Sequence, residues 1–194
     1  QPDLLKRLTA NRRVFLVTGT NGKTTTVRIL RALLEQQGLF VTTNISGANL
    51  DSGLATTLIE AEPAVRAAQR NGRGSAFVFE IDEAFFGKIA DSLNPEVTVV
   101  TNFFRDQLDR FGELRTTRDF IDRGLAKIDA KIVLCGDDSL CASLGQDRSD
   151  RALYFAMSED MLTDQPVRSS DEAAYCLFCG ARYQYLGRAY GHLG

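Results

Sequence analysis

Short runs of apolar residues alternate with longer amphipathic stretches along most of the chain. Four runs are continuous and rich in Val, Ile and Phe, which is typical of strands covered on both faces; they lie at 14–18, 76–81, 97–101 and 131–135. Helical stretches are predicted between them at 23–37, 51–70, 83–92 and 115–128. Gly38 should end the first helix, and Pro63 should interrupt the second. The alternation predicts an α/β fold with a doubly wound, mostly parallel sheet.

The alternation weakens after about residue 145. Residues 158–173 are polar and acidic, and they lead into a tail that carries aromatic residues and a Cys-x-x-Cys motif. We therefore expect a nucleotide-binding domain at 1–157 and a linker with a separate small module at 158–194.

Composition narrows the class of protein only slightly. The 194 residues are 44% hydrophobic and 25% charged, as in ordinary globular domains, and the net charge of −2 gives no pull toward nucleic acid. No apolar run approaches the roughly 20 residues of a spanning helix, and the N-terminus lacks a signal-peptide pattern. A cytoplasmic protein is expected.

The segment TGTNGKTTT at 18–26 follows the first apolar run and opens a helical stretch. Glycines in such a turn let backbone N–H groups face a polyanion, and the helix N-terminus adds the positive end of its dipole. Lys23 is expected to meet the β- and γ-phosphates of a nucleotide, although Val17 replaces the first glycine of the common phosphate-loop pattern. A glycine-rich turn with an incidental lysine is the alternative. The predicted nucleotide contacts are Gly19, Thr20, Asn21, Gly22, Lys23, Thr24 and Thr25.

Carboxylates gather where the second apolar run ends, in FEIDE at 79–83. A buried strand that ends in three acidic groups is costly unless cations or water meet them. Mg²⁺ needs few protein oxygens when phosphates and water complete its shell, so Thr24 and Glu80 would suffice as its ligands. Asp82 and Glu83 have a simpler explanation as acidic residues at a helix N-terminus.

A third polar segment, TNFFRDQLDRFGE at 101–113, follows the next strand at the same sheet edge, where a solvated loop is the alternative. Together the three segments resemble the central ATPase domain of the Mur ligases. More narrowly, TTNISGANLDSG at 42–53, RDQLDRFGE and a Cys-x-x-Cys followed by AYGHLG are similar to the MurT branch of that family. The resemblance implies ATP and Mg²⁺ as cofactors, Glu80 as the magnesium carboxylate and Asn102 in an ATP-contacting turn. Asn44 and Asn49 are expected to contact the substrate.

The MurT resemblance also implies a reaction. The ligase subunit would phosphorylate the D-glutamate carboxylate of the lipid II stem peptide, at the inner face of the membrane. Ammonia released from glutamine by a GatD-type glutaminase partner would then form the amide. Gln107 stands where amino-acid-adding Mur ligases have a histidine, and 117–121 lacks their lysine, so both positions fit the MurT branch better. The alternatives are a Mur or folylpolyglutamate-type ligase that adds an amino acid, and a phosphate-loop domain used for binding or assembly.

Cys176 and Cys179 form half of a zinc ribbon, since two thiolates need two more ligands for a tetrahedral site. The resemblance implies a second cysteine pair beyond Gly194, with His192 as the alternative third ligand. It also implies a later ligase domain, absent from this chain, so that no complete catalytic set is expected here. Cys135 and Cys141 are expected to be small buried hydrophobic residues.

Overall fold

The apolar runs of the sequence become neighbouring strands of one sheet. The computed structural model describes residues 2–10, 12–44, 51–103, 111–158, 175–176, 179–182, 184, 188–189 and 192–193. The elements in chain order are α1 (Pro2–Thr9), β1 (Arg13–Thr18), α2 (Lys23–Gln36), β2 (Phe40–Thr43), α3 (Asp51–Arg70), β3 (Ser75–Glu80), α4 (Glu83–Leu93), β4 (Val97–Val100), α5 (Phe111–Leu125), β5 (Lys131–Cys135), α6 (Ser139–Ser143), β6 (Ala152–Phe155), β7 (Arg188–Ala189) and β8 (His192–Leu193).

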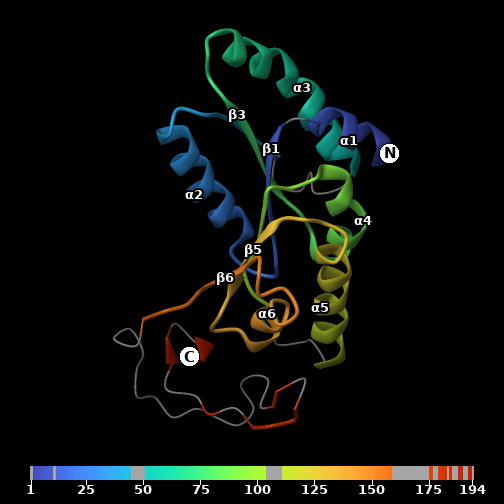
Figure 1. Ribbon diagram of the computed structural model, residues 1–194, viewed down its shortest axis with the longest axis vertical. Helices are drawn as coiled ribbons and strands as arrows, with labels where there is room; N and C mark the ends of the chain where they lie inside the picture. The colour runs from blue at the N-terminus through green and yellow to red at the C-terminus, as the bar shows by residue number, and fades with distance from the viewer. Residues whose placement is uncertain are drawn as a thin grey trace.

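The first six strands form a sheet in the order β2-β3-β1-β4-β5-β6, and every pairing between them is parallel. Helix α2 covers one face, whereas α1, α3, α4 and α5 lie on the other (Figure 1). The predicted α/β class with a parallel, doubly wound sheet is therefore confirmed. Since β1 lies between β3 and β4, the strand order reverses there, and the carboxyl end of β1 is the usual place for a ligand.

The two faces of the sheet carry separate hydrophobic clusters. The smaller cluster lies under α2 and includes Val17, Val27 and Val78. The larger one lies under the other helices and includes the stacked rings of Phe77 and Phe79, whose centroids are 5.7 Å apart. Strands β1 and β3 are buried on both faces, which explains why they were easy to predict as continuous apolar runs.

The secondary structure differs from the prediction at several points. Helix α3 is continuous through Pro63, so the expected interruption is wrong. Leu54, Leu58 and Val65 on this helix are buried in the larger cluster, and that packing outweighs the loss of one backbone hydrogen bond. Helix α5 begins at Phe111 and ends three residues before the predicted end. The elements α1, β2 and β6 were not predicted.

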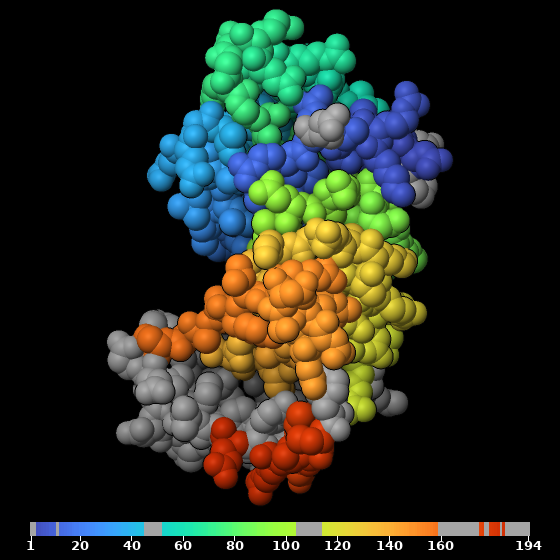
Figure 2. Space-filling view, in the orientation of Figure 1, coloured from blue at the N-terminus to red at the C-terminus, as the bar shows by residue number. Residues whose placement is uncertain are grey.

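The strand β6 lies at the edge of the sheet, and its pattern explains why it was missed. Its side chains are intermediate or exposed, and Leu153 and Tyr154 are both more than half exposed. The segment that contains β6 forms part of the orange surface in Figure 2. A four-residue strand without a buried run gives no clear period in the sequence.

Helices α4 and α5 lie close together because each has a glycine at the crossing. A Cβ atom on Gly87 would come within 2.7 Å of the Phe120 carbonyl oxygen, and one on Gly124 would come within 2.6 Å of the Phe86 ring. The two glycines therefore set the distance between the helices.

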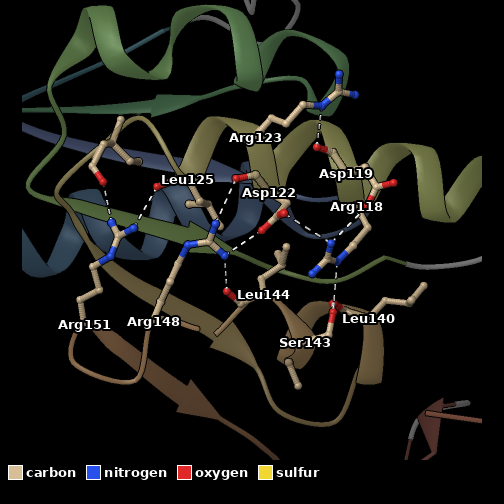
Figure 3. A network of polar contacts seen from close by, with 12 residues as sticks. Arg118, Asp119, Asp122, Arg123, Leu125, Leu140, Ser143, Leu144, Arg148 and Arg151 are labelled. Atoms are coloured by element: carbon tan, nitrogen blue, oxygen red, sulfur yellow. Dashed lines mark hydrogen bonds and ion pairs between the residues drawn. The ribbon is translucent and has the colours of Figure 1, made fainter. Parts of the chain in front are cut away.

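Arginine side chains join α5 to α6 and to the segment before β6 (Figure 3). Arg148 donates to Asp122 Oδ1 and to the Leu144 carbonyl, both at 2.7 Å. Arg151 donates to the Leu125 carbonyl at 3.0 Å and so contacts the C-terminal end of α5. These contacts pair the charges and satisfy carbonyl groups that the helix end leaves open.

No helix in the described part of the chain is long and apolar enough to cross a membrane.

Candidate functional site

The predicted phosphate loop lies at the carboxyl end of β1 and leads into α2. Gly22 is the N-cap residue of α2, with φ of 82°, and no side chain caps the helix. The backbone N–H groups of the first turn are therefore not engaged by a capping side chain, and the dipole adds positive potential there. This is the geometry of an anion-binding helix N-terminus.

Gly19 brings the loop against the end of β4. Its φ is +115°, and a Cβ atom there would lie 2.4 Å from Thr101 Oγ1 and 2.9 Å from the Asn102 carbonyl oxygen. Only glycine fits both the backbone angle and the space. The loop and the turn after β4 are consequently in direct backbone contact.

Asn102 holds the loop with three hydrogen bonds. Its carbonyl accepts from the Thr20 N–H at 2.8 Å, and its Oδ1 accepts from the Asn21 N–H at 3.0 Å. Its Nδ2 donates back to the Asn21 carbonyl at 3.1 Å. The N–H groups of Thr20 and Asn21 are therefore used to fix the loop, and the N–H groups left to face an anion are those at the start of α2.

Lys23 lies folded over its own loop. Its Nζ donates to the Gly19 carbonyl at 2.6 Å and the Thr20 carbonyl at 3.1 Å, and it lies 3.5 Å from Glu83 Oε2. The side chains of Lys23 and Glu83 are each 15% exposed. The ammonium group is thus held at the mouth of the loop, beside the N-terminus of α2.

Glu80 ends β3 next to the loop, as the sequence predicted, and it is 9% exposed. The Thr24 hydroxyl donates to Glu80 Oε2 at 2.7 Å. Among the described residues, Glu80 forms no ion pair with Lys or Arg, although it is a buried carboxylate. A hydroxyl and a carboxylate oxygen side by side are the hard ligands that Mg²⁺ prefers, so this pair fits that ion.

The other acidic residues of FEIDE have different partners. Asp82 is the N-cap of α4, where its side chain accepts from the Ala84 N–H at 2.9 Å, as the simpler explanation predicted. Glu83 lies in the first turn of α4 but also pairs with Lys23. Sequence reasoning missed this contact, because 60 positions separate the two residues.

Asp138 is a second residue that sequence reasoning missed. Its side chain caps α6 by accepting from the N–H groups of Leu140 and Cys141. It also accepts from the Phe103 N–H, and so it ties the turn after β4 to the end of β5. An aspartate directly before a helical stretch is a capping signal, but nothing in the sequence indicates the contact with Phe103.

Asn44 is buried and contacts the backbone of Glu80. Asn49 and Gln107 lie outside the described residues. The predicted roles of Asn44, Asn49 and Asn102 toward ligands therefore remain predictions.

Cys176 and Cys179 lie beside an antiparallel bridge between Tyr175 and Arg182. The Cys176 N–H donates to the Ala181 carbonyl at 2.8 Å, and the Gly180 N–H donates to the Cys176 carbonyl at 3.1 Å. Within the described ranges, no group of three or more His, Cys, Asp or Glu side chains is placed to share a metal ion. Cys176 and Cys179 carry two thiol groups, and a complete zinc ribbon is not present among the described residues.

The other two cysteines belong to the sheet domain. Cys141 is buried, its Sγ lies 3.4 Å from the Val100 carbonyl oxygen, and burial raises the pKa of its thiol well above the ordinary value. Cys135 is half-buried, and burial raises its thiol pKa too. Both pack with the larger hydrophobic cluster, Cys141 within it and Cys135 at its margin.

The chain matches the Mur ligase middle domain over residues 17–160. It is 35% identical over 193 residues to "Lipid II isoglutaminyl synthase (glutamine-hydrolyzing) subunit MurT" of Streptococcus pneumoniae. The aligned region covers 99% of this chain and 41% of that protein. A Staphylococcus aureus protein of the same name is 30% identical over 181 residues, 93% of this chain and 39% of that protein.

A solved structure of MurF ligase from Thermotoga maritima in complex with ADP has a TM-score of 0.60 at 23% identity, and it covers 80% of this chain and 35% of that chain. This likeness concerns the fold. The chain spans 41% and 39% of the length of the two curated relatives.

Proposed function

Because the chain belongs to the Mur ligase family, we propose that it forms the ATP-binding part of a carbon–nitrogen ligase of the MurT type. The observation that carries the proposal is the match to MurT at 35% identity over 99% of the chain. The hydrogen-bonded phosphate loop and the Thr24–Glu80 pair support it, because a ligase that consumes ATP needs both a polyphosphate site and a metal site.

In the proposed reaction, a carboxylate oxygen of the D-glutamate in the lipid II stem attacks the γ-phosphorus of ATP. ADP leaves, and an acyl phosphate forms. Ammonia then attacks the carbonyl carbon and releases phosphate, which gives D-isoglutamine. A GatD-type glutaminase would supply the ammonia, and the lipid substrate would place the reaction at the inner face of the membrane.

The residues of this chain would serve mainly the first step. Lys23 would move from the loop carbonyls and Glu83 to the β- and γ-phosphates and stabilise their charge. The N-terminus of α2 would orient the phosphates, with backbone contacts from Gly22, Lys23, Thr24 and Thr25. Thr24 and Glu80 would hold Mg²⁺, which when bound neutralises charge on the phosphate oxygens. The acyl transfer would depend on residues outside the described set.

We also propose that the tail is a separate module after a nucleotide-binding domain at 1–157. The Met157 N–H donates to Asp137 at 2.8 Å, which ties this residue to the first domain. Cys176 and Cys179 would supply two ligands of a structural zinc site, and the remaining ligands would come from outside the described residues. Elemental analysis of the intact protein should find about one zinc per chain, and Cys176→Ser with Cys179→Ser should remove it.

The ammonia source tests the proposed function. The purified intact protein should amidate lipid II with ammonium and ATP, and it should use glutamine only after a glutaminase subunit is added. Incorporation of an amino acid in place of ammonia would instead support a Mur or folylpolyglutamate-type ligase. Nucleotide binding without any ligation, with the glutaminase present, would support a binding or assembly module.

A further inference from the structure

Asn44, the residue that follows β2, makes a two-point contact with the backbone of Glu80. Its Oδ1 accepts from the Glu80 N–H, and its Nδ2 donates to the Glu80 carbonyl, both at 2.9 Å. Asn44 is 8% exposed. The last backbone pair between β2 and β3 is Thr43 with Val78, so the amide of Asn44 continues the ladder where the strand itself ends.

Glu80 is held on its other side by β1. It pairs with Val17 in the parallel register, and the Ile81 N–H donates to the Val17 carbonyl at 2.9 Å. The final residue of β3 is therefore fixed from both neighbouring strands, by backbone on one side and by the Asn44 amide on the other. A terminal strand residue fixed in this way has one direction for its Cα–Cβ bond, and here that bond lies on the Thr24 side of the sheet.

That direction leads to Thr24, whose hydroxyl reaches Glu80 Oε2 at 2.7 Å. We propose that Asn44 is a positioning residue that acts through Glu80 and sets the affinity of the phosphate loop for a divalent cation. This inference rests on the proposed function, because it takes Thr24 and Glu80 as the metal ligands. It gives Asn44 a role other than the substrate contact expected from the sequence.

Few other side chains could bond both backbone groups of Glu80. The two buried backbone groups of Glu80 need one acceptor and one donor on a short side chain, and asparagine carries the two on separate atoms without a change of charge. Alanine would leave the Glu80 N–H and carbonyl without these partners, so the carboxylate would lose its fixed direction. Partners outside the ligand shell typically change metal affinity by about 10-fold to 100-fold.

The test is a Mg²⁺ titration of ADP binding by the intact protein, followed with a fluorescent ADP analogue. Asn44→Ala should raise the half-saturating Mg²⁺ concentration by about 10-fold. Saturating Mg²⁺ should restore binding, and the KM for lipid II at saturating Mg²⁺ should stay unchanged. Asn44→Ser, which can satisfy only one of the two backbone groups, should give a shift in the same direction and serves if the alanine variant does not fold. The matched control is Asn71→Ala, which alters an exposed asparagine just after α3.

Glu80→Gln is the reference variant, because it separates two kinds of failure. If Glu80→Gln raises the Mg²⁺ requirement and Asn44→Ala does not, the positioning role is wrong while the metal site stands. A raised KM for lipid II in Asn44→Ala, with an unchanged Mg²⁺ requirement, would also overturn the positioning role and would favour a substrate contact. An unchanged Mg²⁺ requirement in Glu80→Gln would contradict the proposed metal site and the role of Asn44 with it.

Discussion

The Thr24 hydroxyl donates a 2.7 Å hydrogen bond to Glu80 Oε2 across 56 positions of the sequence. One residue begins α2 and the other ends β3, and the parallel pairing of β1 with β3 brings them to the same edge of the sheet. The pair joins the phosphate loop to the acidic segment, where we propose that a metal bound to nucleotide phosphates would lie.

Thr24→Val and Glu80→Ala should therefore both weaken ATP use through the metal. Each variant should lose activity at low Mg²⁺ and recover part of it at high Mg²⁺, because weakened metal binding is a mass-action loss. Initial rates across a Mg²⁺ series would measure this. Thr56→Val on α3 removes an exposed hydroxyl that bonds only within its own helix, and it should behave like wild type. A loss of activity that no Mg²⁺ concentration reduces would argue against the metal role.

Asn102→Ala should produce the opposite pattern. Two side-chain hydrogen bonds to Asn21 disappear, each worth about 1 kcal/mol, so ADP affinity should fall by about 10-fold to 30-fold because the loop is less well ordered. Saturating Mg²⁺ should not restore it. Calorimetric titration of ADP at high Mg²⁺ would measure the loss, with Asn71→Ala as control. Full recovery at high Mg²⁺ would show that Asn102 acts through the metal instead.

Arg148→Met should lower stability more than Arg123→Met. Arg148 is 13% exposed and contacts both Asp122 and Leu144, whereas Arg123 makes an exposed contact with the Asp119 carbonyl and lies over Phe120. We expect a loss of about 1–2 kcal/mol for Arg148, since Asp122 is partly exposed and water offsets some of the cost. Denaturant unfolding would measure both variants. Equal losses would mean that the network in Figure 3 adds little stability.

Cysteine labelling should separate Cys179 from Cys141. Cys179 is exposed, whereas Cys141 is buried and its thiol pKa is raised. A raised thiol pKa means that the folded state favours the protonated form of Cys141. The stability that the protonated thiol contributes is present below the ordinary thiol pKa and declines as the pH rises above that value. At pH 8, after chelation, iodoacetamide should modify Cys179 first, and Cys141 should react only on unfolding. Mass spectrometry of the peptides would show the order; early modification of Cys141 would contradict its burial.

Most of the sheet could be predicted because β1, β3 and β4 are buried runs with a clear composition. The edge strands β2 and β6 could not, because each has only four residues and Val41 is the only buried side chain among the eight, so neither segment shows a period. Continuity through Pro63 depends on tertiary packing, which outweighs a local signal.

The candidate site also combines residues that the sequence predicts with contacts that it does not predict. Glycine, lysine and threonine of the loop, and the carboxylate at the end of β3, follow from local chemistry and strand order. The partners that hold these residues do not follow from local chemistry. Asn102 forms hydrogen bonds with Asn21 across 81 positions of the sequence, and Asn44 forms them with Glu80 across 36 positions. Those contacts depend on the register of neighbouring strands, which composition alone does not define.

We propose that the loop binds the phosphates of ATP and that Lys23 stabilises the transferred group. The most direct measurement is ATP-dependent phosphoryl transfer by Lys23→Ala in the intact protein, with Lys6→Ala, an exposed lysine on α1, as control. We predict a fall of about 100-fold to 1000-fold in turnover for Lys23→Ala, with the circular dichroism spectrum preserved and the control unchanged. Turnover within a few-fold of wild type in a folded Lys23→Ala protein would contradict this role of Lys23 and of the loop.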